Sequence, residues 1–152
     1  MNRLLEELVE GGLVKCERLA LDATFIKAWS RRDPADDGQG LSDPDARVGR
    51  DGKSYDLGYK SHVAVDADSD NPVAVVSASA NENEKRHSEE LLGKASLVVE
   101  GFKSVVGDSQ YSSKRVRDSI HEHGALPVIP YMSNQRCGGV GLRVDRFFRV
   151  SG

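Results

Sequence analysis

The stretch 104-SVVGDSQYSSKRVRDSI-120 decides the fold, because in it a short apolar strand gives way to a helix. Ser112 is a favourable N-cap, and Tyr111 and Val116 occupy the flanking positions of a hydrophobic staple. The pattern predicts a helix that begins at Ser112. Asp108 therefore lies at the junction between the strand and the helix.

Asp108 has two interpretations at this junction. In open α/β sheets ligands bind beyond the carboxyl ends of the strands, where a lone carboxylate can face a cation. Aspartate also caps turns by accepting hydrogen bonds from the backbone, and the stretch taken alone favours this structural role. The rest of the chain has to decide between them.

The elements around this stretch follow from apolar spacing and turn residues. In chain order we expect a short helix over 2–10, a strand over 18–29, a long loop over 30–53, a two-stranded hairpin over 54–81, an amphipathic helix from Asn83, a strand over 103–108, a helix over 112–123 that Gly124 ends, and a strand over 126–131. The order predicts a three-stranded antiparallel meander followed by a βαβαβ unit.

The first strand carries the second acid of interest. The segment 18-RLALDATFIKAW-29 is mostly apolar on both faces, which is typical of a central strand, and Asp22 stands in its middle. The alternative is that Asp22 is a strand acid that simply faces solvent. It is disfavoured because the flanking residues are apolar on both faces and an unpaired acid is costly to bury. Trp29, at the end of the strand, is expected to pack in the core.

Composition limits the class of protein. A chain of 152 residues with 38% apolar and 30% charged residues suits one domain. No apolar run is as long as a membrane span, and the acidic N-terminus is unlike a signal peptide, so we expect a cytoplasmic protein without a membrane partner. Cys16 and Cys137 lack the spacing of a metal site.

The charge of the whole chain and that of its last part point in opposite directions about a nucleic-acid partner. The overall value of −3 argues weakly against a nucleic-acid partner. From Ser112 onward, however, the chain has seven basic residues and only three acidic ones. Such a run is often only a solvated surface, so it identifies no partner by itself.

The element order is the layout of an α/β ribonuclease-H-like mixed sheet. In that layout the strand at 18–29 and the strand at 103–108 are neighbours, which places Asp22 beside Asp108. Two adjacent carboxylates repel and need a cation between them, and Mg²⁺ suits them because it takes few protein oxygens. A pair of such ions stabilises both the attacking and the leaving oxygens when a phosphodiester is cut.

Four segments together resemble the DDE transposases of bacterial and archaeal insertion sequences, across about residues 18–150. They are LALDATFIKAW, YDLGYKSHVAVDADSDNPVAVVSASANENEKRH, VVGDSQYSS and HGALPVIPY. The resemblance implies that Asp22 and Asp108 are the first two of three metal-binding catalytic acids. It also implies Mg²⁺ or Mn²⁺ as cofactor, double-stranded DNA at transposon ends and target as partner, a possible homodimer, and DNA cleavage with strand transfer.

The chain departs from the family at the third acid, which is a Glu on a helix after the strand that corresponds to LPVIPY. Glu122 precedes that strand, and Asp145 falls ahead of the expected helix. We therefore expect residues 1–17 to be the remnant of an N-terminal helical region, and residues 18–152 to be a catalytic domain truncated at its C-terminus.

Three functions stay open. The chain is a transposase, a catalytically dead remnant that inhibits by binding DNA or transposase, or a separate nuclease that completes its site with Asp145. Lys60 is a candidate phosphate contact, although a solvated strand face explains it equally well. Arg143, Arg146 and Arg149 are candidate DNA contacts, or part of an incomplete element.

Overall fold

The computed structural model describes residues 3–30 and 42–132. Its elements are α1 (Arg3–Glu10), β1 (Arg18–Lys27), β2 (Arg47–Asp51), β3 (Ser54–Asp66), β4 (Pro72–Ser79), α2 (Glu84–Ser96), β5 (Ser104–Gly107), the 3₁₀ turn η1 (Ser109–Tyr111), α3 (Lys114–Glu122) and β6 (Leu126–Val128).

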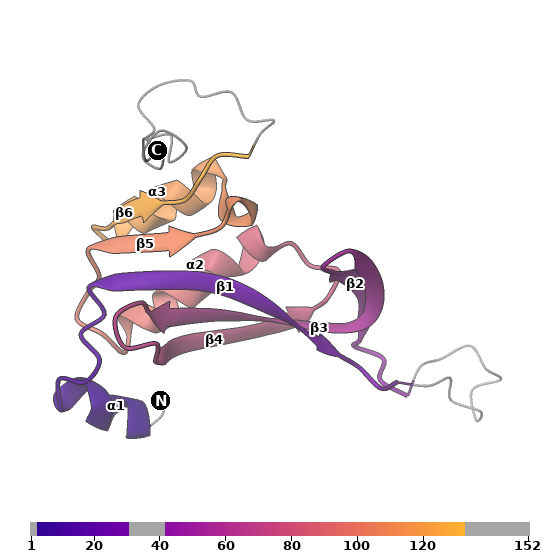
Figure 1. The fold of residues 1–152 in the computed structure, drawn as a ribbon, viewed down its shortest axis with the longest axis horizontal. Coiled ribbons are helices and arrows are strands. Elements are labelled where there is room, and N and C mark those ends of the chain that lie inside the picture. Colours follow the sequence, from indigo (N-terminus) through magenta and orange to yellow (C-terminus); the bar gives the residue numbers. More distant parts are fainter. Residues whose placement is uncertain (1–2, 31–41, 133–152) are drawn as a thin grey trace, which may run out of the picture.

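The strands form one mixed sheet in the order β2-β3-β1-β5-β6, with β4 also paired to β3 (Figure 1). Strands β1, β3 and β4 form the antiparallel meander, whereas β5 is parallel to β1 and β6 is parallel to β5. The predicted meander and βαβαβ unit are confirmed. The central position predicted for the first strand is also confirmed, because β1 lies between β3 and β5.

One strand was not expected. The predicted loop over 30–53 is wrong for Arg47–Asp51, which forms β2 and pairs with the first residues of β3. In β2 only Gly49 is buried, and a Cβ at that position would lie 2.0 Å from the carbonyl oxygen of Ala80. The strand therefore depends on close backbone contact, which apolar alternation does not reveal.

The helices α2 and α3 pack on one face of the sheet (Figure 1). Their core contacts come from buried side chains: Leu91, Leu92, Ala95, Val116 and Ile120 on the helices, and Leu19, Leu21 and Val105 on the strands. The opposite face is more open, because Val75 and Val106 there are 48% and 38% exposed.

Two features at the ends of the described chain bear on the sequence predictions. Helix α1 packs Leu5, Leu8 and Val9 against the core, and the domain boundary after residue 17 stays a prediction. Trp29 is 88% exposed, with the Lys27 ammonium 5.9 Å from the centre of its ring, so the expectation that it packs in the core is wrong. In the described part of the chain, no helix has the length and apolar character that a membrane span requires.

A substitution at Gly58 tests the close pairing of β1 and β3. A Cβ at Gly58 would lie 2.2 Å from the Ile26 carbonyl oxygen, so Gly58→Ala should lower the free energy of unfolding by about 1–3 kcal/mol through overpacking. Urea denaturation measures the change. Gly93→Ala is the matched control, because Gly93 lies inside α2 with no atom within 4 Å of its added Cβ, and should stabilise the protein by about 0.5–1 kcal/mol. Equal effects of the two substitutions would contradict the strand packing.

Candidate functional site

The parallel pairing of β1 with β5 brings two carboxylates together. Leu21 and Gly107 are Cα partners in this pairing. Asp22 follows Leu21, and Asp108 follows Gly107, so the two acids are the next neighbours along the pair, where β5 ends. Both residues are exposed. The structure thus brings together the two residues that the sequence singled out.

Asp22 is held by the centre of the sheet. It pairs with Val63 of β3, and by strand alternation it belongs to the face opposite Leu21 and the two helices. Its Oδ1 accepts a hydrogen bond of 2.8 Å from the Ala23 amide. The backbone of β1 is paired with β3 at Asp22 and with β5 as far as Leu21, so the carboxylate stands on a rigid support.

Asp108 stands on a turn. Its backbone is extended, with φ −77° and ψ 176°, and it is the N-cap of η1. The Gln110 amide donates to Oδ1 at 2.9 Å, and the Tyr111 amide donates to the Asp108 carbonyl oxygen at 3.2 Å. The capping interpretation is therefore confirmed. The bond to Gln110 uses one carboxylate oxygen, Oδ1, so a capping role is compatible with binding a cation through Oδ2.

The turn shifts the start of the following helix. The N-cap of α3 is Ser113, whose Oγ accepts a hydrogen bond from the Val116 amide at 3.2 Å, so the prediction of Ser112 as the cap is wrong by one residue. Residues 109–111 form η1, and Ser112 is the extended residue after it. Ser112 is buried, and its Oγ accepts a hydrogen bond of 3.2 Å from Arg117.

Arg117 joins the turn to the end of β6. Besides Ser112, its guanidinium donates to the Ile129 carbonyl oxygen at 2.8 Å and lies 4.1 Å from the centre of the Tyr131 ring. Sequence reasoning missed this residue. A carbonyl oxygen is an acceptor that every residue offers, so no motif marks the contact in advance.

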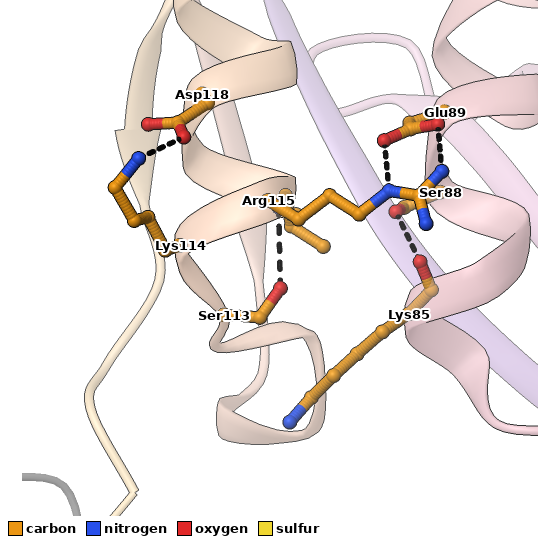
Figure 2. A network of polar contacts seen from close by, with 8 residues as sticks. Lys85, Ser88, Glu89, Ser113, Lys114, Arg115 and Asp118 are labelled. Carbon is orange, nitrogen blue, oxygen red and sulfur yellow. Dashed lines mark hydrogen bonds and ion pairs between the residues drawn. The ribbon is translucent and has the colours of Figure 1, made fainter.

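A second set of polar contacts fixes α3 against α2 (Figure 2). Arg115 makes a bidentate ion pair with Glu89 of α2, with distances of 2.5 and 2.6 Å, and these hydrogen bonds hold the pKa of the Glu89 carboxyl below its usual range. Lys114 pairs with Asp118 along α3. Both pairs are largely exposed, so neither adds much stability. The Arg115–Glu89 pair joins the two helices and orients α3, which follows the Asp108 turn, whereas the Lys114–Asp118 pair lies within α3.

The donor set fits a hard divalent cation only in part. Two exposed carboxylates are suitable ligands for Mg²⁺ or Mn²⁺. Over residues 3–30 and 42–132, no group of three or more His, Cys, Asp or Glu side chains is arranged to hold a metal. Glu122 is the last residue of α3, at the opposite end of that helix from the turn that carries Asp108. Asp145 lies outside the described residues.

Of the predicted DNA contacts, the structure describes Lys60, which does not lie beside this pair. Lys60 pairs with Phe25, on the face of the sheet opposite Asp22. Its contact with phosphate stays a prediction. Arg143, Arg146 and Arg149 lie outside the described residues.

Comparison with known families decides the relationship. A sequence profile described as "Transposase DDE domain" matches residues 16–141, a range that contains both acids. The chain belongs to this family. Members of the DDE transposase family use divalent metal ions. A search among curated proteins found no match to this DDE domain.

Solved structures show the fold of the DDE domain. A piggyBac transposase synaptic complex with hairpin DNA matches with 15% identity and a TM-score of 0.54, over 79% of this chain and 24% of the piggyBac chain. This DDE domain thus spans about a quarter of that protein, and the likeness confirms the ribonuclease-H-like fold. A Mos1 transposase paired-end complex with the left transposon end matches with 12% identity and a TM-score of 0.44, over 82% and 38% of the two chains. A Mos1 mariner paired-end complex with Mn matches with 14% identity and a TM-score of 0.43, over 84% and 43%.

Two substitutions at Asp108 distinguish the role of its side chain as a capping acceptor from the role of its negative charge. Asp108→Ala removes the acceptor for the Gln110 amide and should lower the free energy of unfolding by about 1 kcal/mol. Asp108→Asn keeps an acceptor oxygen and should leave stability near that of the parent. Urea denaturation of the metal-free proteins checks both. A stable Asp108→Ala variant would contradict the capping role.

Proposed function

We propose that this chain is the catalytic domain of a DDE-type DNA transposase that cleaves DNA strands and joins them to a target during transposition of an insertion sequence. The observation that carries the proposal is the position of Asp22 and Asp108, side by side where β5 ends, inside the range that the family profile matches. The substrate is double-stranded DNA, both at the transposon ends and at the target.

Asp22 and Asp108 would hold divalent metal ions. Asp22 lies on β1 and Asp108 in the turn directly after the neighbouring strand β5, and hydrogen bonds from the Ala23 and Gln110 amides fix one oxygen of each carboxylate. Two bound Mg²⁺ or Mn²⁺ ions would supply charge stabilisation, one to the attacking oxygen and the other to the leaving oxygen of a phosphodiester. We take Mg²⁺ as the natural ion, with Mn²⁺ as a substitute.

The arrangement of the pair also suits a large substrate. Both acids are exposed, and Asp22 belongs to the face that α2 and α3 leave open. A DNA backbone can approach the carboxylates from that side without displacing either helix. We propose that the third acid comes from outside residues 3–30 and 42–132, since two acids alone leave metal coordination incomplete. The homodimer, and DNA contacts by Lys60 and the three C-terminal arginines, stay predictions.

Metal binding is the first test of the proposal. Asp22→Asn and Asp108→Asn should each weaken Mn²⁺ binding at least about tenfold, because each removes a charged ligand oxygen. Electron paramagnetic resonance of free Mn²⁺ measures the affinity. Asp118→Asn is the matched control, because Asp118 is an exposed acid on α3 paired with Lys114. The site assignment fails if all three variants bind Mn²⁺ like the parent.

A second candidate is a chain that binds DNA or transposase without cutting. It is favoured by the finding that, among the described residues, no group of three or more His, Cys, Asp or Glu side chains is arranged to hold a metal. Strand cleavage distinguishes the candidates: with Mn²⁺ and supercoiled plasmid, the transposase hypothesis predicts nicking that Asp22→Asn abolishes. An intact plasmid, together with slower transposition when the chain is added to a full-length transposase reaction, would favour the inhibitor. If nicking occurs, its loss in Asp145→Asn would favour the separate nuclease.

A further inference from the structure

The turn that carries Asp108 has a second side, which faces the core. Tyr111, the last residue of η1, is 2% exposed and belongs to the main apolar cluster. Its ring packs over Gly107, since a Cβ on Gly107 would lie 3.5 Å from Tyr111 Cδ2. The residue directly before Asp108 is thus held beneath the Tyr111 ring.

The Tyr111 hydroxyl connects this turn to another strand. Its oxygen lies 3.5 Å from Nδ1 of His62, a long hydrogen bond between two buried groups. His62 is on β3 and is 1% exposed, and its partner across the sheet is Ala23, the residue after Asp22. Because β1 lies between β5 and β3, the contact spans the strand that carries Asp22.

The His62 ring is itself held in place. It stacks on His87 of α2, with ring centres 4.9 Å apart and an angle of 29° between the ring planes. Nε2 of His87 lies 3.2 Å from Oε2 of Glu82, in the loop before α2. The imidazole that faces Tyr111 is therefore packed against a ring of α2, on the core side of the sheet.

We propose that Tyr111 and His62 are positioning residues, which hold the Asp108 carboxylate in register with Asp22 for metal binding. This inference rests on the proposed function of the carboxylate pair. Packing alone does not explain the two residues, since apolar rings of the same shape would fill the core without burying polar atoms. The polar contact links the η1 turn to β3, across the strand that carries Asp22, and so fixes the Asp108 turn relative to Asp22.

Tyr111→Phe tests this role, because it removes the hydroxyl and keeps the ring over Gly107. We expect its Mn²⁺ affinity to fall about tenfold, as for other groups that orient metal ligands. Tyr59→Phe is the matched control. Tyr59 is on β3, the strand of His62, and its hydroxyl donates a hydrogen bond of 2.6 Å to Asp43, which is shorter than the contact between Tyr111 and His62. The control should bind Mn²⁺ like the parent even if it loses more stability. Melting temperatures are measured alongside.

A double-mutant cycle tests whether the two residues act through one contact. His62→Leu should weaken Mn²⁺ binding by a factor similar to that of Tyr111→Phe, and the double variant should bind no more weakly than either single variant. Circular dichroism identifies a temperature at which every variant is folded, and Mn²⁺ binding is measured at that temperature. If His62→Leu does not fold, Tyr111→Phe and its control still decide the question.

The outcomes separate this inference from the proposed function. If Asp22→Asn and Asp108→Asn weaken Mn²⁺ binding while Tyr111→Phe changes it less than twofold, the positioning role is wrong and the metal site stands. A lower melting temperature with unchanged affinity also overturns the positioning role, because it shows a purely structural tyrosine. If the parent binds no Mn²⁺, or if neither acid variant affects binding, both proposals fail.

Discussion

The parallel register between β1 and β5 is the constraint on which the site depends. Leu19 pairs with Val105 in this register, and both side chains are fully buried beneath the helices. Because side chains alternate between the faces of a sheet, a slip of one residue would turn the apolar set of one strand toward solvent. The same slip would also separate Asp108 from Asp22. The burial of two apolar residues at one end of the strand pair therefore fixes the position of two carboxylates at the other end.

The exposure of the pair explains how the fold tolerates two like charges side by side. Water screens the repulsion between exposed carboxylates, whereas the same pair in the core would carry a large electrostatic cost. The amides of Ala23 and Gln110 provide a further compensation, because each donates to one of the carboxylates. The carboxylates of the site therefore contact solvent and backbone amides. Gly107 and the Tyr111 ring, on the other side of the turn, pack against each other in the core.

The sequence predicted the parts of the fold that repeat a pattern. Alternation located β1, β3 and β4, and apolar spacing located α2. The element order, once matched to the ribonuclease-H-like layout, placed Asp22 beside Asp108. Sequence reasoning missed β2, because Arg47–Asp51 has one buried residue and its pairing depends on backbone contact at Gly49. It also misplaced the cap of α3, since two adjacent serines offer the same hydroxyl. The choice of Ser113 depends on the η1 turn, which no local preference of Ser112 reveals.

The two interpretations of Asp108 turned out not to compete. A carboxylate has two oxygens, and the backbone of η1 engages Oδ1 through a single amide. The cap then serves the site, because a carboxylate that is already oriented loses less freedom when it binds a cation. A neutral cap such as Asn would support the turn equally well, so the turn by itself does not require the charge at position 108. Under the proposed function, the charge at position 108 matters because Asp22 lies beside it on the neighbouring strand. For this reason the paired acids, rather than either residue alone, support the assignment of a metal centre.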